Sequence, residues 1–228
     1  MPTSSADRSA TESGSPTYQC PGHAPDHADP GDPGFRHDDL YASPPPWDIG
    51  HPQAALKALA KEGALRGRVL DVGCGTGEHA LMAAALSLET TGIDLAGNAL
   101  HTAQQKARAR GLTARFLRYD ALKLADLGEL FDTILDSGLF HIFTDRERTP
   151  YVDGLRDVLE PGGRYFHLGF SNSEPGNWEH RRVRKLSQAE IVAAFSNGWR
   201  IDSIETASIE STINPQGIRA WLVAATRV

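Results

Sequence analysis

Short apolar runs alternate with longer amphipathic stretches over most of the chain. The apolar runs predict seven strands, and the stretches between them carry helix signals such as the capping pattern Ser187 to Glu190. The predicted helices are Gln53–Glu62, Glu78–Ser87, Gly97–Arg110, Arg146–Leu159 and Ser187–Ser196. The predicted strands are Arg68–Val72, Glu89–Asp94, Thr113–Tyr119, Phe131–Asp136, Arg164–Phe170, Trp199–Glu205 and Ile218–Thr226.

This order of elements predicts the fold class. Repeated strand and helix units favour a parallel sheet with helices on both faces. The last two strands follow each other with only a loop between them, so we expect them to pair antiparallel. The prediction is therefore an α/β, doubly wound, seven-stranded and mostly parallel sheet with an antiparallel last strand.

The N-terminal part of the chain has a different composition. Residues 1–34 are rich in Ser, Pro, Gly, Asp and His, and they lack the apolar side chains that would offset the entropy of ordering. We expect a disordered or loosely ordered tail there and a single domain over 35–228. Within that domain, 35–62 combines aromatic residues with three successive prolines and predicts a lid over a site.

Charge and cysteine content limit which binding partners and which cellular location are expected. The net charge is −6 and no long basic run occurs, which argues against nucleic acid as the main partner. The two cysteines do not suggest a disulfide framework, so a cytoplasmic location fits best, and no apolar run predicts a membrane span. Cys20, His23 and His27 do not have the spacing of a zinc module, so we predict no metal site. A monomer and a homodimer both remain open.

The stretch VLDVGCGTGE places Gly73, Gly75 and Gly77 between the first strand and its helix. Such a turn brings backbone N–H groups and a helix N-terminus towards a ligand. A dinucleotide fingerprint would place its third glycine at position 78, which is Glu78, and a Walker loop is absent from this turn. We interpreted the Glu78 carboxylate as repelling a phosphate, which predicts a nucleoside-like ligand without phosphate.

Four aspartates, Asp71, Asp94, Asp120 and Asp136, lie in or at the ends of successive predicted strands. Together they predict an acidic crevice that favours a cationic ligand. Asp94 is placed to accept hydrogen bonds from ribose hydroxyls. Any one of these residues could instead be a helix N-cap. S-adenosylmethionine, a sulfonium-bearing nucleoside without phosphate, fits the set.

At these residues the chain resembles the class I S-adenosylmethionine-dependent methyltransferases, over roughly residues 40–228. The strings that carry the resemblance, in order, are VLDVGCGTGEHAL, TGIDL, YDAL, FDTILDSGLFH and LEPGGRYFHL. The string PPWDIGHPQ resembles a narrower group of thiopurine, thiol and halide methyltransferase-like enzymes. The segment before Tyr41 does not align with that group.

The resemblance implies a Rossmann-like methyltransferase fold and a set of cofactor contacts. The glycines would lie under the methionine and ribose of S-adenosylmethionine, and Asp71 would orient their loop. Strand-end residues would hold the ribose, the adenine and the methionine portion, while a tryptophan would close over the sulfur. The implied cofactor-binding residues are Trp47, Asp71, Gly73, Gly75, Gly77, Asp94, Leu95, Asp120, Ala121, Asp136 and Ser137.

Methyl transfer from a sulfonium is an in-line displacement that depends mainly on positioning. Aromatic faces of Trp47, Phe140 and Tyr41 are expected to accommodate the positive sulfur. His141 follows the fourth predicted strand and is the predicted base or hydrogen-bond partner of the nucleophile, with Tyr41 as a weaker candidate. The alternative for His141 is a histidine that satisfies loop backbone. A thiol acceptor is partly ionised on its own and gains little from a base.

We therefore expect an enzyme that methylates a small molecule on a thiol sulfur or on a phenolic or quinol oxygen. The alternatives are methylation of nitrogen or carbon in a small aromatic metabolite, and a cofactor-binding regulator without turnover. The predicted acceptor pocket combines the lid, the loop after Asp136 and the segment Ser171–Leu186. Within that segment, Arg181 and Arg182 fit either an acidic acceptor or a surface loop.

Overall fold

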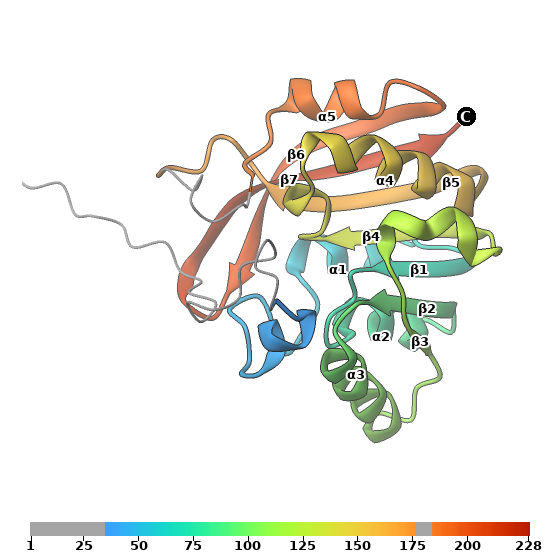
Figure 1. Ribbon diagram of the computed structural model, residues 1–228, viewed down its shortest axis with the longest axis vertical. Helices are drawn as coiled ribbons and strands as arrows, with labels where there is room; N and C mark the ends of the chain where they lie inside the picture. The colour runs from blue at the N-terminus through green and yellow to red at the C-terminus, as the bar shows by residue number, and fades with distance from the viewer. Residues whose placement is uncertain (1–34, 177–183) are drawn as a thin grey trace, which may run out of the picture.

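The computed structural model describes residues 35–176 and 184–228 and contains one seven-stranded sheet (Figure 1). The strand order is β3-β2-β1-β4-β5-β7-β6. The strands are β1 (Arg68–Val72), β2 (Glu89–Asp94), β3 (Arg115–Arg118), β4 (Phe131–Ser137), β5 (Leu159–Phe170), β6 (Trp199–Ser211) and β7 (Asn214–Arg227). The helices are α1 (Ala54–Lys61), α2 (Glu78–Ala85), α3 (Gly97–Ala109), α4 (Asp145–Val158) and α5 (Gln188–Ala194), with short 3-10 helices η1 (His37–Tyr41), η2 (Ala121–Leu127) and η3 (Phe140–Ile142).

Pairing in the sheet agrees with the predicted fold class. Strands β1 to β5 pair in parallel, whereas β7 is antiparallel to both β5 and β6. The strand order reverses at β1. From β1 the chain adds β2 and then β3 on one side of the sheet, and it then crosses to the other side of β1 to form β4. The carboxyl ends of β1 and β4 therefore border the crevice where open α/β sheets bind ligands.

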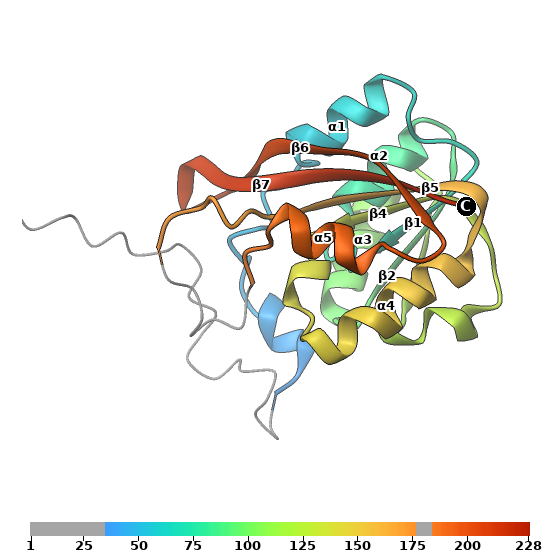
Figure 2. The same ribbon diagram turned by 90° about the horizontal axis from the view of Figure 1, so that it is seen from above.

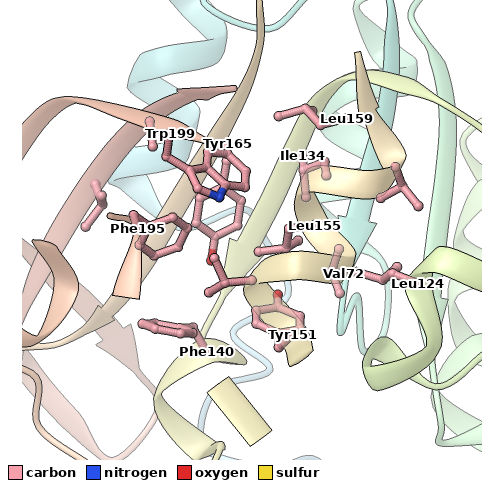
Figure 3. Close-up of a cluster of buried hydrophobic side chains, with 14 of the residues drawn as sticks. Val72, Leu124, Ile134, Phe140, Tyr151, Leu155, Leu159, Tyr165, Phe195 and Trp199 are labelled. Carbon is pink, nitrogen blue, oxygen red and sulfur yellow. The ribbon is translucent and has the colours of Figure 1, made fainter. Parts of the chain in front are cut away.

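Helices lie on both faces of the sheet (Figure 2), and alternate residues of the strands belong to the two clusters that pack there. Val69 and Leu135 pack with Leu56 of α1 on one face, whereas Leu70 and Ile134 belong to the cluster on the opposite face. Figure 3 shows that second cluster, in which Phe140, Tyr151, Leu155, Tyr165 and Phe195 fill the space under α4 and α5. This alternation fixes which side chains of β4 and β5 can reach the crevice.

The C-terminal hairpin is longer than predicted. We expected strands over Trp199–Glu205 and Ile218–Thr226, but β6 and β7 continue towards each other to Ser211 and Asn214. The polar stretch beyond Glu205 gave no strand signal, yet the ladder continues because Ile209 pairs with Ile218 and both are buried beside α1. This extension carries the hairpin tip to the segment that precedes α1.

Candidate functional site

The glycine loop joins β1 to α2 and has the backbone that only glycine adopts readily. Gly73, Gly75 and Gly77 have φ angles of +69°, +51° and +85°. Their surroundings differ: a Cβ on Gly73 would lie 3.1 Å from Leu139, and one on Gly75 would lie 2.6 Å from the Tyr41 hydroxyl. These two glycines therefore lie under the segments that cover the loop.

Gly77 has a different neighbourhood from the one we predicted. A Cβ there would lie 2.8 Å from Ala103 of α3 and 3.0 Å from Phe116 of β3. The close approach at this position is between the helix and the sheet inside the protein, not towards the crevice. The missing side chain at Gly77 is therefore a packing requirement, and the expectation that its backbone lies under the cofactor stays a prediction.

Two strand carboxylates hold the loop in place. Asp71 is 1% exposed, and its Oδ2 accepts the N–H of Ala80 in the first turn of α2 at 2.9 Å. Asp94 accepts the N–H of Gly75 and the N–H of Ala96, each at 2.8 Å. Burial raises the pKa of Asp71 to about 7 and also raises the pKa of Asp94. Asp94 is half-buried, so it still faces the crevice.

Of the predicted lid 35–62, the part that precedes α1, residues 35–53, lies over the glycine loop, and we use the name lid for this part. Its Tyr41 ring is edge-on to Trp47 at 6.3 Å between centroids, and the Trp47 indole N–H donates to the Tyr41 hydroxyl at 3.3 Å. Trp47 remains 45% exposed, so much of its aromatic surface is free for a ligand. Tyr41 thus stands beside Gly75, and the role of the pair as a cover for a sulfonium stays a prediction.

Hydrogen bonds to several parts of the domain hold the lid. Its Asp48 carboxylate accepts the hydroxyl of Thr76 in the glycine loop at 2.9 Å. The Asp38 carboxylate accepts the N–H of Asn98 at 3.0 Å, which caps the N-terminus of α3 from a distant part of the chain. At the hairpin tip, Thr212 N–H donates to the Pro46 carbonyl at 2.9 Å. None of these contacts was predicted, because nothing in the local sequence identifies their partners.

Glu78 does not play the role that we gave it. Its carboxylate is 7% exposed and forms two hydrogen bonds of 2.8 Å with the Arg110 guanidinium, and Lys106 lies 2.9 Å away. These two cations of α3 neutralise it and lower its pKa against the opposing effect of burial. The argument that Glu78 repels a phosphate is therefore wrong, and the nature of the cofactor rests on other observations.

The other predicted cofactor contacts lie at the strand ends. Leu95, Asp120, Ala121 and Ser137 are all half-buried at the carboxyl edge of β2, β3 and β4. Asp120 also accepts the N–H of Leu122 at 2.9 Å, so it caps η2, as the alternative reading of such residues allowed. The structure brings these side chains to the same edge as the glycine loop, and their contacts with adenine and methionine stay predictions.

Asp136 is the predicted contact that the structure does not bring to the surface of the crevice. It is 0% exposed, and its Oδ2 accepts the hydroxyls of Tyr151 and Tyr165 at 2.7 Å each. Its Oδ1 accepts the N–H of Leu139 at 3.0 Å and lies 3.3 Å from His167 Nδ1. His167 and the tyrosines lower the pKa of Asp136 against the effect of burial. Asp136 organises the following loop from below and has no surface for the cofactor.

Neither predicted catalytic residue has the properties of a base. His141 is 4% exposed, its Nδ1 accepts the N–H of Phe170 at 3.3 Å, and burial lowers its pKa to about 3. His141 thus satisfies a backbone N–H, as the alternative describes, although the N–H belongs to the last residue of β5 and not to a loop. Burial, with a smaller contribution from Asp94, raises the pKa of Tyr41 far above its usual range. Tyr41 therefore stays protonated and can only donate or accept a hydrogen bond.

A surface groove of about 500 Å³ lies elsewhere, between α1 and the β6–β7 hairpin. Its lining includes Ala58, Leu59 and Leu222, and none of the predicted site residues contributes to it. The groove is therefore separate from the glycine loop. Among the described residues no helix is long and apolar enough to cross a membrane.

With this geometry in hand, comparisons with known proteins define the class. A profile described as a methyltransferase domain matches residues 69–163, which run from β1 into β5. The chain is 32% identical to the 2-heptyl-1-hydroxyquinolin-4(1H)-one methyltransferase of Mycobacteroides abscessus, over 74% of each chain. It is 42% identical to the demethylmenaquinone methyltransferase of Thermus thermophilus, over 69% of this chain and 73% of the relative.

Solved structures with a similar fold include methyltransferases as well. A structure from work on the conversion of a disulfide bond into a thioacetal group during echinomycin biosynthesis is similar at a TM-score of 0.74 and 38% identity. That match covers 83% of this chain and 91% of the other. An S-adenosylmethionine-dependent methyltransferase from Methanosarcina mazei shares the fold at a TM-score of 0.62 and 20% identity, over 74% of this chain and 97% of the other.

The chain belongs to the class I S-adenosylmethionine-dependent methyltransferases. The resemblance from the ordered sequence strings is confirmed at this level, and so are the cofactor and the enzyme class. Membership of the thiopurine-like group stays a prediction. The tail 1–34, with Cys20, His23 and His27, and the arginines Arg181 and Arg182 lie outside the described residues.

Proposed function

We propose that the protein methylates a small-molecule acceptor on a thiol sulfur or an acidic hydroxyl oxygen, and that the acceptor loses its proton without help from a protein base. The observation that carries the second part is the state of His141, which is buried, hydrogen-bonded through Nδ1 and depressed in pKa to about 3. A group of this kind cannot take a proton efficiently near neutral pH.

The chemistry of such a reaction requires little from the protein beyond alignment. S-adenosylmethionine supplies an electrophilic methyl group, and an acceptor that is already an anion supplies the electron pair. The residues of this chain bind, orient and exclude water: Asp94 towards the ribose, Trp47 and Tyr41 over the sulfonium, and the lid against solvent. A thiol of pKa near 8.5 is ionised to a useful extent at neutral pH, as is a hydroxyl on an electron-poor ring.

The known relatives support a small acceptor of this type. One is named for a hydroxyquinolone, and the structure at 38% identity comes from work on a disulfide that becomes a thioacetal, which is sulfur chemistry. The demethylmenaquinone relative favours a second candidate, in which the methyl group goes to another atom of an aromatic acceptor. The net charge of −6 supports neither a nucleic-acid substrate nor a broad anionic surface as partner.

The test is a pH–rate series with thiols and phenols of graded acidity. If the acceptor ionises by itself, the midpoint of the rising limb of kcat/KM should follow the pKa of each acceptor. His141→Gln should leave those midpoints in place. A midpoint that is the same for every acceptor and disappears in His141→Gln would establish a protein base and contradict the proposal.

The second candidate is separated by the site of methylation. With methyl-labelled S-adenosylmethionine, fragment masses of the product identify the atom that gained the methyl group. Label on sulfur or oxygen supports the proposal, whereas label on ring carbon or nitrogen supports the alternative. Cofactor binding without turnover of any acceptor, including a disulfide, would favour the regulator hypothesis.

A further inference from the structure

Arg148 is a buried cation beside the loop that follows β4. It lies in the first half of α4, its side chain is 9% exposed, and its Cζ stands 5.4 Å from the centroid of the Phe140 ring. Phe140 itself is 1% exposed, so one face of the guanidinium is covered by an aromatic ring. A buried charge of this kind is costly unless it is paired.

The ion pairs of Arg148 are long and shared. Its Nη1 is 3.5 Å from the Asp145 carboxylate and 4.0 Å from that of Glu190. Both carboxylates also pair with Arg184, whose Nη2 approaches Glu190 at 3.3 Å. Two cations thus share two carboxylates, one of which is 77% exposed to solvent. Burial and the neighbouring Arg184 lower the pKa of Arg148, which is the sign of a cation with too little compensation.

The remaining edge of the guanidinium carries unused donors. Within residues 35–176 and 184–228, Nε and Nη2 of Arg148 are buried and have no hydrogen-bond partner. These two nitrogens form the side edge of the guanidinium, whose two parallel N–H groups match the oxygens of a carboxylate. An unpartnered buried edge of this kind needs an explanation, because native proteins rarely leave such donors unsatisfied.

The position of Arg148 relates this edge to the reaction. The loop after β4 begins beside the cofactor loop, since the Leu139 side chain approaches Gly73, and it continues directly into Phe140 and His141. Arg148 therefore lies behind the part of the loop that follows the cofactor contact. The same region is where an acceptor reaches the carboxyl ends of β4 and β5.

We propose that the Nε–Nη2 edge of Arg148 binds an acidic group of the methyl acceptor, a carboxylate or a delocalised oxyanion. The inference rests on the proposed function, because it names the class of small molecule that the enzyme takes: an anionic one, held at a point separate from the atom that is methylated. Asp145, Glu190 and Arg184 set the local charge but form no hydrogen bond with this buried edge. His141 and His167, which also face Phe140 or its loop, provide no competing negative charge.

Matched acceptors test this directly. The three isomeric mercaptobenzoates and the three mercaptobenzamides have the same shape and the same nucleophile but differ in charge. We expect the wild-type enzyme to prefer at least one acid over its amide by tenfold or more in kcat/KM. Arg148→Gln should abolish that preference while changing kcat/KM for the amide less than threefold. Arg148→Lys should keep part of the preference for the acid.

The control is Arg146→Gln, which removes the same charge from an exposed position on α4. It should leave the preference for the acid unchanged. If Arg148→Gln lowers kcat/KM for acid and amide equally, Arg148 is structural and the inference is overturned. An undiminished preference in Arg148→Gln, or no preference for any acid in the wild type, overturns it as well.

A binding experiment separates this inference from the proposed function. If none of the six thiols is methylated, the proposed acceptor chemistry fails, and calorimetry with benzoate and benzamide on protein saturated with S-adenosylhomocysteine decides about Arg148. Benzoate binding in the wild type that is at least tenfold weaker in Arg148→Gln, with Arg146→Gln unaffected, supports the acid site. Benzoate binding that is absent, or equal in all three proteins, overturns it.

Discussion

Substitution of Asp94 by asparagine separates its two roles. In the structure its carboxylate accepts two backbone N–H bonds of 2.8 Å, from Gly75 and Ala96. Asparagine keeps one acceptor oxygen but turns the other into an NH₂ group that faces an N–H. The change should remove one charged hydrogen bond and leave a half-buried donor unpaired, which costs about 1–3 kcal/mol in the free energy of unfolding.

The same substitution should also lower the affinity for the cofactor. A hydrogen bond from a ribose hydroxyl to a carboxylate is worth about 1.5–3 kcal/mol, which corresponds to roughly a 10- to 150-fold rise in Kd. Calorimetry with S-adenosylhomocysteine measures the affinity, and denaturant unfolding of the free protein measures the stability. Asp126→Asn, the same change at an exposed position, is the control. Lower stability with unchanged affinity would show that Asp94 only holds the loop and that the ribose lies elsewhere.

Three further changes follow from the contacts. Gly77→Ala should destabilise the fold by about 1–3 kcal/mol, because the added Cβ would overlap α3 and the residue has a positive φ. Gly111→Ala, at a φ of +63° with open space around it, should cost about 1 kcal/mol, and thermal unfolding compares the two variants. Tyr165→Phe should cost about 1–3 kcal/mol in urea unfolding by removing a donor from the buried carboxylate of Asp136. The pKa of Asp71 is raised to about 7 in the folded state. Its contribution to the free energy of unfolding is therefore greatest below about pH 4 and is lost as the pH rises through 7. Because asparagine does not ionise, Asp71→Asn should become more stable relative to the wild type as the pH rises over that range.

The sequence predicted the sheet well because strand and helix periods are local properties. Strands β1 and β2 begin and end where the pattern placed them, and the capping box at Ser187 and Glu190 forms as expected. The extension of β6 was missed because its outer half is polar and is held by pairing with β7 and by bonds between Gln53 and the backbone of Glu210. Such partners are distant in sequence and leave no local signal.

The candidate site was predictable in position but not in the environment of each side chain. Strand-end order placed Asp71, Asp94 and Asp136 near one edge, and the register of the sheet confirms that placement. Whether a carboxylate faces the crevice or the interior changes when the strand register shifts by one residue. It also depends on which hydrogen-bond donors the neighbouring elements place beside it. For Asp136 the decisive donors are Tyr151 and Tyr165, which come from a helix and a strand that follow it in the chain.

The lid is hydrogen-bonded to both halves of the site. Asp48 holds it to the glycine loop, and Pro46 holds it to the hairpin tip, where the β6–β7 extension ends. Each such bond contributes only about 1 kcal/mol net, so releasing the stretch around Trp47 from Thr76 and Thr212 costs little compared with the stability of the domain. Tyr41 lies directly over Gly75, so the cofactor and the aromatic cover must adjust to each other on binding. A base-free transfer to an anionic acceptor fits this arrangement, because its rate depends on how well the lid excludes water and aligns the two reactants.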